Sequence, residues 1–282
     1  MSERYPVIKN LSPWRRISLA TWGRPNDPTV YGNLEVDMRR AVAYLEEANR
    51  PGGARVTVTH LVVKAIAKAL VENPEVNAFV AGRRIRKRST VDVYCQVDVN
   101  SGGDLSGVNL REVDRKSVGD IAEELAERAR RVRSGRDEGT EKSKSVMTRL
   151  PPWVLRPALR LSEFLVFSLG IELAGLGLSA DQFGTAMVSN VGAFGVGHGL
   201  APLVPVSHSA IVLLVGEVSD RAVVDDGQIV VAPRMNLGCT FDHRLIDGYR
   251  ASVMAGTVIA SVEDPLAAFG PPHGQDSATR SN

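Results

Sequence analysis

The sequence predicts an α/β fold, because runs with strand periodicity alternate along the chain with runs of helical periodicity. The clearest strand is Met235–Phe241, in which every second residue is apolar, and Val91–Val99 alternates in the same way. The clearest helix begins with Thr59 as its cap and ends before Pro74. The 282 residues contain no internal repeat and no long linker rich in Pro, Ser or Gly, so one large domain is expected.

Composition narrows the class of protein. The chain is 44% hydrophobic and 23% charged, which is ample for a core, and its net charge of +2 does not favour nucleic acid as a partner. Cys95 and Cys239 both lie in apolar strand-like runs and imply no disulfide framework. The first ten residues lack the apolar core of a signal peptide, so a cytoplasmic location is expected.

In the first half of the chain, helix-capping residues and prolines indicate where the helices begin and end. Four prolines make residues 1–33 irregular, and Asp37 is then expected to cap a helix. In the next helix, the one capped by Thr59, the polar positions Lys64 and Lys68 are expected to face water.

A basic run, Gly82–Ser89, follows these helices. We interpret it as the exposed turn of a hairpin between Ala78–Val80 and Thr90–Val99, although a phosphate of coenzyme A would also be attracted to it. Gly107–Leu110 is a further short strand, and Ser117 with Asp120 forms a capping box for a charged helix that runs to Arg133.

In the second half, Thr185–Asn190 reads as a strand that enters the glycine-rich stretch Gly192–Gly199. Prolines follow where a phosphate-binding helix would have to begin, so we interpret these glycines as tight turns and not as a nucleotide site. His198 and His208 lack metal-ligand spacing and are expected to be loop residues. Two more strands, Ile211–Val215 and Gln228–Ala232, are joined through a hairpin turn at Asp225-Asp226-Gly227.

The strand Met235–Phe241 runs into a polar turn, and a helix, Tyr249–Val262, follows it. The turn holds His243, and a histidine at a strand-to-helix turn is well placed for proton transfer because its ordinary pKa lies near neutral pH. The alternative is that His243 caps the turn and takes no part in chemistry.

The turn sequence D-H-R-x-x-D-G, from Asp242 to Gly248, resembles the active-site signature of the acyltransferase components of 2-oxo acid dehydrogenase complexes. These enzymes share their fold with chloramphenicol acetyltransferase. Five other stretches resemble the same family: Leu11–Arg16, Leu34–Met38, Thr57–Asn77, Val188–Gly195 and Ala210–Gly216. The resemblance covers roughly residues 10–269 except for a stretch near 135–180. It implies a chloramphenicol acetyltransferase-like two-layer sandwich, in which a mixed sheet has its helices packed on one side.

The resemblance also implies a function and a set of site residues. The function is transfer of an acyl group between dihydrolipoyl and coenzyme A thiols, with His243 as general base and Ser189 as the hydroxyl that stabilises the oxyanion. Asp247 is expected to be structural, paired with either Arg15 or Arg16, and Gly248 to allow a backbone too close or too bent for a side chain. The family assembles as a homotrimer whose active site lies between subunits.

The resemblance further limits the cofactors and partners. Coenzyme A is expected as a substrate and no metal is expected. The family carries its lipoyl and subunit-binding domains ahead of the catalytic domain, and this sequence shows neither, so the lipoyl group is expected on a separate protein or domain. Two alternatives remain open: a catalytically idle trimeric scaffold, and an acyl-CoA-dependent transferase that acts on a small amine or hydroxyl acceptor.

Residues 147–178 form an apolar insertion that the family usually lacks. It is interrupted by Glu163 and Glu172, so it is too short to span a membrane and membrane contact is not expected. It is interpreted as a helical hairpin on its own domain, a seal for an acyl pocket, or a docking surface for other dehydrogenase-complex subunits. The catalytic domain is expected to cover residues 1–269. The polar tail, 270–282, is expected to be disordered and to lack the hydrophobic anchor that joins trimers into larger particles.

Overall fold

The computed structural model describes residues 27–49, 54–82, 84–99, 104–134, 157, 161, 164–168, 182–204 and 207–272. The strands are β1 (Thr29–Asp37), β2 (Ala78–Ala81), β3 (Arg84–Lys87), β4 (Val93–Val99), β5 (Asp104–Leu110), β6 (Ala186–Asn190), β7 (Ile211–Asp225) and β8 (Gln228–Asp242). The helices are α2 (Arg39–Ala48), α3 (Val58–Glu72), α4 (Val118–Arg133), α7 (Gly248–Glu263) and α8 (Pro265–Phe269). Three short helical turns are η1 (Val113–Arg115), η2 (Phe164–Ser168) and η4 (Gly192–Phe194).

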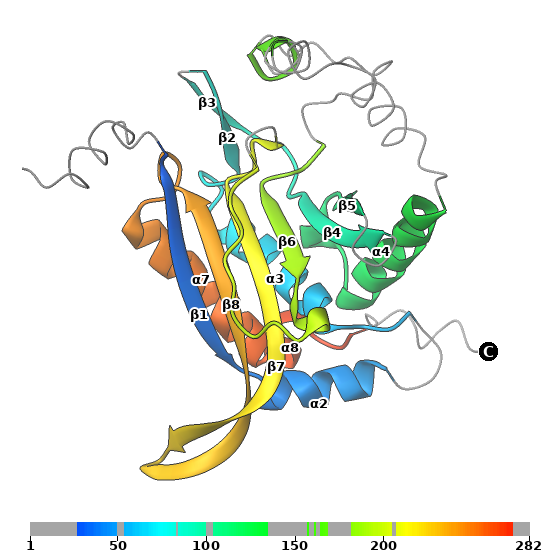
Figure 1. The fold of residues 1–282 in the computed structure, drawn as a ribbon, viewed down its shortest axis with the longest axis vertical. Coiled ribbons are helices and arrows are strands. Elements are labelled where there is room, and N and C mark those ends of the chain that lie inside the picture. The colour runs from blue at the N-terminus through cyan, green and yellow to red at the C-terminus, as the bar shows by residue number, and fades with distance from the viewer. Residues whose placement is uncertain are drawn as a thin grey trace, which may run out of the picture.

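A six-stranded mixed sheet and a layer of helices on one of its sides make up the fold (Figure 1). The strand order is β1-β8-β7-β6-β4-β5, with β6 parallel to both neighbours and the other pairs antiparallel. Alternate residues of the sheet, such as Val188, Leu213 and Leu237, pack with Ile66 of α3 and Met254 of α7 in one core. The predicted fold class is confirmed.

The face of the sheet away from the helices is crossed by the glycine-rich segment that follows β6. A Cβ atom on Gly238 would overlap the carbonyl oxygen of Gly199, and one on Gly216 would overlap that of Gly197. The tight-turn interpretation is therefore incomplete: Gly195 does turn the chain, at φ 76°, but other glycines let two backbones cross in contact.

His198 fastens this segment to the sheet. Its Nε2 atom lies 3.2 Å from Nη1 of Arg221 on β7 and 3.2 Å from Nδ2 of Asn236 on β8. Both partners donate, so Nε2 accepts and the proton of the neutral ring lies on Nδ1. His198 is a loop residue, as expected, and its role is to hold the loop over the two strands.

Both predicted caps of the first two helices need correction. The cap of α3 is Thr57, whose backbone is extended, and not Thr59, which lies inside the first turn. The Thr57 amide donates to Nδ1 of His60 at 2.8 Å and so completes a capping box. Met38 is the cap of α2, and Asp37 ends β1 with its carboxylate accepting the amide of Arg39 at 3.0 Å.

Lys64 does not face water. Its Nζ atom donates to the carbonyl oxygens of Val113 and Asp114, at 3.2 and 2.8 Å, and burial lowers the pKa of its amine. A lysine on an otherwise apolar stretch of α3 therefore donates to two backbone carbonyl groups of η1. The neighbouring Lys68 is half-buried and lies farther from η1 along the helix.

The basic run forms a hairpin of its own, and its predicted extent is wrong. β2 pairs with β3 inside the run, and the chain reverses near Gly82, whose φ is 59°. The last arginine of the basic run, Arg88, is buried. Its guanidinium lies 4.8 Å from the centre of the Phe79 ring, and its Nε donates to the hydroxyl of Thr185. An arginine that closes the core is not part of an exposed turn.

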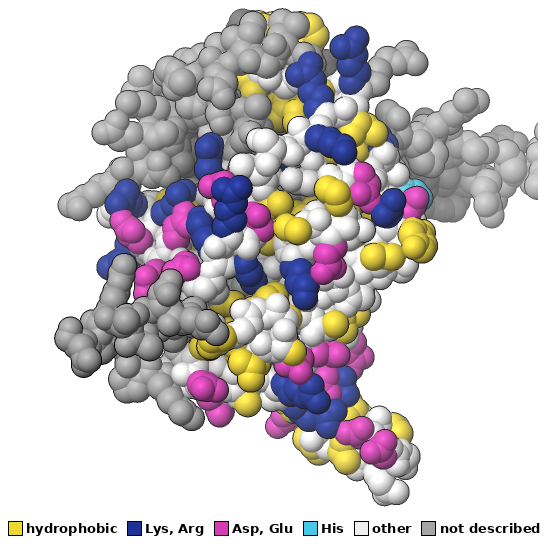
Figure 2. All heavy atoms as spheres, turned by 180° about the vertical axis from the view of Figure 1, so that it is seen from behind, with side chains coloured by type: hydrophobic (Ala, Val, Ile, Leu, Met, Phe, Trp, Pro, Cys, Tyr) yellow, Lys and Arg dark blue, Asp and Glu magenta, His cyan; other side chains and the backbone are white. Residues whose placement is uncertain are grey.

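β7 and β8 are far longer than predicted and protrude beyond the body of the sheet (Figure 1). The predicted turn is confirmed, with Asp226 and Gly227 at φ 47° and 77°. Val224 pairs with Ile229, and both residues are at least 75% exposed. Figure 2 shows apolar side chains on the surface of the protruding part at its lower end. An isolated two-stranded ribbon is marginally stable.

Part of the sequence predictions concerns residues that the structure does not describe. Arg15 and Arg16 lie outside the described residues, as does the insertion apart from Pro157, Leu161 and 164–168. Among the described residues, no helix is both long enough and apolar enough to cross a membrane.

We predict that the stability of the fold decreases in mild acid through His60. Burial lowers the pKa of His60 to about 4 from 6.5. Between these pH values the unfolded chain binds more protons than the folded one. The free energy of unfolding should therefore fall as the pH drops, by up to about 1.4 kcal/mol per pH unit.

The test is urea unfolding at pH 7 and pH 5. His60→Gln keeps an acceptor for the Thr57 amide without titrating, so its loss of stability in acid should be smaller than that of the wild type. His198→Gln, at an exposed histidine, serves as the control. Equal acid sensitivity of the wild type and His60→Gln would contradict this role.

A second prediction concerns the backbone crossing over the sheet. Gly238→Ala should destabilise the fold by about 1–3 kcal/mol, because the new Cβ forces the Gly199 carbonyl away. Gly32→Ala, on the adjacent β1, is the matched control because a Cβ there meets nothing within 4 Å. Thermal unfolding measures both, and equal stability of the two variants would disprove the tight crossing.

Candidate active site

The turn after β8 carries His243 and is fixed by backbone hydrogen bonds. The His243 amide donates to the carbonyl oxygen of Pro28 at 2.8 Å. The amides of Leu245 and Ile246 both donate to the carbonyl oxygen of Asp242, each at 3.0 Å. The turn is thereby tied to the segment before β1 and to its own start, while the His243 side chain remains exposed.

One contact sets the protonation geometry of the His243 ring. Its Nδ1 atom lies 2.7 Å from the carbonyl oxygen of Ile246. A carbonyl oxygen only accepts, so Nδ1 carries the proton and Nε2 of the neutral ring presents its lone pair. The predicted position of His243 is confirmed, and its ring is arranged as a general base requires.

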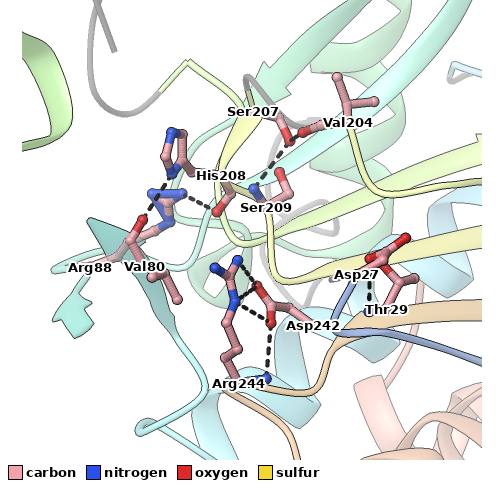
Figure 3. Close-up of polar contacts among 10 residues, drawn as sticks. All are labelled: Asp27, Thr29, Val80, Arg88, Val204, Ser207, His208, Ser209, Asp242 and Arg244. Carbon is pink, nitrogen blue, oxygen red and sulfur yellow. Dashed lines mark hydrogen bonds and ion pairs between the residues drawn. The ribbon is translucent and has the colours of Figure 1, made fainter. Parts of the chain in front are cut away.

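Asp242 and Arg244 form an ion pair across the turn (Figure 3). Nε of Arg244 lies 2.9 Å from Oδ1 of Asp242, and Nη2 lies 2.6 Å from Oδ2. The Arg244 amide also donates to Oδ1, at 2.9 Å, and the pair raises the pKa of the guanidinium. The sequence analysis did not predict this ion pair. The signal that could have indicated it is the pair of opposite charges on either side of the turn histidine.

Asp247 is the N-cap of α7. Its Oδ1 atom accepts the amide of Arg250 at 2.8 Å, so the carboxylate fixes the start of the helix that follows the turn. The reason predicted for Gly248 is wrong within a single chain. A Cβ on Gly248 would meet nothing within 4 Å, and its φ is not positive.

Ser189 lies on β6, on the sheet face away from the helices. It is paired with Leu214 of β7, which is paired in turn with Gly238 of β8. His243 is five residues beyond Gly238. At about 3.3 Å per residue and about 4.8 Å between strands, the Cα atoms of Ser189 and His243 are therefore roughly 19 Å apart. One chain does not bring these two residues together.

Neither cysteine is suited to carry an acyl group. Burial raises the pKa of the Cys95 thiol to about 12 and that of the Cys239 thiol to about 11. Both therefore remain protonated at neutral pH, whereas the thiolate is the nucleophile. Within the described ranges, no group of three or more His, Cys, Asp and Glu side chains is arranged to hold a metal ion.

The chain is similar in sequence and in fold to known acyltransferases. The family model for the 2-oxoacid dehydrogenases acyltransferase (catalytic domain) matches residues 22–148 and 177–269. The residues between these two matched segments, 149–176, lie within the predicted insertion. A dihydrolipoyllysine-residue acetyltransferase component of the pyruvate dehydrogenase complex of Zymomonas mobilis is 27% identical, over 91% of this chain and 50% of that protein. The succinyltransferase component of the 2-oxoglutarate dehydrogenase complex of Cupriavidus necator is 29% identical, over 83% and 46%.

The chain thus spans about half the length of the curated relatives that it matches. Among solved structures, a probable dihydrolipoamide acetyltransferase from Listeria monocytogenes superposes with a TM-score of 0.63 at 22% identity, over 93% of this chain and 96% of that one. The cubic core of the pyruvate dehydrogenase multienzyme complex gives a TM-score of 0.61 at 23% identity, over 86% and 84%. These structures share the fold described above.

Proposed function

This chain belongs to the family of 2-oxoacid dehydrogenase acyltransferase catalytic domains, and we propose that it moves an acyl group between a dihydrolipoyl thiol and the thiol of coenzyme A. His243 is the general base in this proposal and Ser189 the oxyanion donor. The relatives named above are acyltransferase components of such complexes, which supports the reaction class.

The chemistry follows from the two side chains. An ordinary thiol has a pKa of about 8.5, so Nε2 of His243 accepts its proton as the sulfur attacks the thioester carbonyl. The carbonyl oxygen becomes an oxyanion, to which the Ser189 hydroxyl donates a hydrogen bond. The intermediate collapses with cleavage of the original carbon–sulfur bond, and the departing thiolate takes the proton back from His243. Both residues end unchanged.

The observation that carries the proposal is the separation of the two residues. Proton transfer and oxyanion binding act on one carbonyl group, so the groups responsible must lie within hydrogen-bond reach of it. Roughly 19 Å between the Cα atoms of Ser189 and His243 excludes this within one chain. We therefore propose that His243 of one copy meets Ser189 of another in a homotrimer, in which each copy gives one residue and receives the other.

Two further features support the proposal, the first for an assembly of copies and the second for the choice of residues. The apolar pair Val224 and Ile229 stands exposed on the protruding hairpin, which is a surface suited to cover by another chain. The structure of the Azotobacter vinelandii dihydrolipoamide acetyltransferase comes from work on a catalytic serine, histidine and asparagine. There the asparagine follows the histidine by four positions, as Asp247 follows His243 here.

The proposal also includes a lipoyl carrier and other subunits of a dehydrogenase complex. The lipoyl group arrives on a separate protein or domain, and other dehydrogenase-complex subunits bind through residues 147–178. Asp247 acts as a structural residue that caps α7 and so steadies the His243 turn. Absence of a metal and a cytoplasmic location remain predictions from the sequence.

We predict that His243→Ala reduces transfer from acetyl-CoA to free dihydrolipoamide by roughly 10²–10⁴-fold, the usual contribution of a general base. His198→Ala is the control, because His198 holds a loop and stands outside the proposed chemistry. Circular dichroism verifies that both variants fold. Wild-type turnover by His243→Ala would rule out His243 as the base.

Ser189→Ala should lower kcat by roughly a hundredfold, the cost of losing one oxyanion donor, with little change in KM. Ser134→Ala provides the control, since Ser134 is exposed at the end of α4 and its hydroxyl donates to the carbonyl oxygen of Arg131 at 3.0 Å. Steady-state kinetics with both substrates distinguishes the outcomes. A loss confined to KM would make Ser189 a binding residue and not an oxyanion donor.

A further inference from the structure

An apolar pocket of about 240 Å³ lies on the side of the sheet that the helices cover. It is located between α7 and the edge of the sheet formed by β1 and β8, which lie next to one another in Figure 1. Its lining includes Ile66 of α3, Cys239 and Phe241 of β8, and Met254 of α7. Ser189 lies on the opposite face of the sheet, so this pocket is separate from the proposed site of acyl transfer.

Small residues leave this space open. Gly32 of β1 lines the pocket, and a Cβ added to it would meet nothing within 4 Å. The φ of Gly32 is not positive, so neither its backbone conformation nor a close contact within the described chain requires glycine there. Ala251 and Ala255, one helical turn apart on α7, contribute to the same lining. Larger side chains at these three positions would fill the pocket.

The lining indicates the charge of a ligand. Among the described residues, none with a charged side chain lines the pocket. Two polar side chains of the lining already donate elsewhere: Ser252 to the carbonyl oxygen of Tyr249 at 2.8 Å, and Asn33 to Oδ1 of Asn236 at 3.0 Å. A charged ligand would lose its hydration here without gaining an ionic partner, which is costly, whereas an uncharged apolar ligand would not.

The volume of the pocket indicates the size of a ligand. A dry apolar cavity of about 150 Å³ is large enough to bind benzene. Pockets for drug-sized ligands begin at roughly 300 Å³. At about 240 Å³ this pocket lies between the two, so it suits a molecule that is larger than benzene and smaller than most drugs.

Two residues of the lining also contact the His243 ring. The carbonyl oxygen of Ile246 lies 2.7 Å from Nδ1 of His243. The Phe241 ring meets the His243 ring edge-on, with 6.3 Å between the ring centroids. Because a molecule in the pocket packs against Ile246 and Phe241, it limits the movement of the turn that these residues flank.

We propose that this pocket binds an uncharged apolar molecule of the size given above, and that the bound molecule restrains the His243 turn. The site is a second ligand site, on the other face of the sheet from Ser189. This inference concerns binding and the mobility of the turn, so it does not rest on the proposed acyl transfer.

Calorimetry with the full chain tests binding, with indole as the uncharged probe and indole-3-acetate as its charged counterpart. The wild type should bind indole at least about tenfold more tightly, because the carboxylate finds no partner in the pocket. Gly32→Leu fills the space and should weaken indole binding by about tenfold or more. Gly256→Leu is the matched control, since a Cβ on Gly256 also meets nothing within 4 Å, but Gly256 lies outside this lining. Thermal unfolding verifies that both variants fold.

Cys239 reports whether indole occupies this pocket. At an indole concentration of about ten times Kd, alkylation of Cys239 by N-ethylmaleimide should slow by about tenfold, since only the empty pocket exposes the thiol. Hydrogen exchange reports the restraint of the turn. The amides of Leu245 and Ile246, which donate to the Asp242 carbonyl oxygen, should exchange at least about threefold more slowly with indole bound. The Gly195 amide, in a turn on the other face of the sheet, is the reference.

Each part of the inference has its own contrary result. Indole that binds no better than indole-3-acetate, or that binds Gly32→Leu as well as the wild type, would overturn the ligand site. Cys239 that reacts equally fast with and without indole would overturn it too, as expected if another segment or a second copy covers the pocket. Slower alkylation with unchanged exchange at Leu245 and Ile246 would overturn the restraint of the turn. All of these readouts can be made on a protein that transfers no acyl group.

Discussion

The strand register of the six-stranded sheet is the constraint that fixes the positions of Ser189 and His243. β6, β7 and β8 are locked side by side by continuous pairing, which fixes Ser189 across from Leu214 and Gly238 while His243 lies beyond the end of β8. Sliding a strand by one residue would turn its apolar side chains out of the core, so the register is rigid. In the proposed reaction a single chain therefore presents half of each site, which makes assembly part of the proposal.

Contacts within a single chain orient the His243 ring and hold its turn. The Ile246 carbonyl oxygen fixes the proton on Nδ1, and the Asp242–Arg244 pair holds the turn. Asp247 caps the helix that leaves the turn. None of these three contacts involves Nε2, the atom that we propose accepts the thiol proton. The insertion adds to this scaffold from outside, through Phe167 on His208.

The sequence predicted the elements that have local signals and missed those made by tertiary contact. The alternation before Asp242 and the polar turn were enough to place His243 between strand and helix. Thr59 was chosen as a cap because it precedes an apolar run, yet only the backbone distinguishes it from Thr57. Arg88 was assigned to an exposed turn because its burial depends on Phe79 and Thr185, which no local pattern indicates.

The most direct test of the central claim is complementation between two inactive variants. His243→Ala and Ser189→Ala are co-expressed with different affinity tags, and mixed assemblies carrying both tags are purified and assayed for acyl transfer to dihydrolipoamide. Because each variant supplies the residue that the other lacks, some interfaces in a mixed trimer hold an intact His243 and an intact Ser189. Activity is expected to return in the mixed assemblies and in neither parent. Mixed assemblies as inactive as the parents would contradict a site shared between copies.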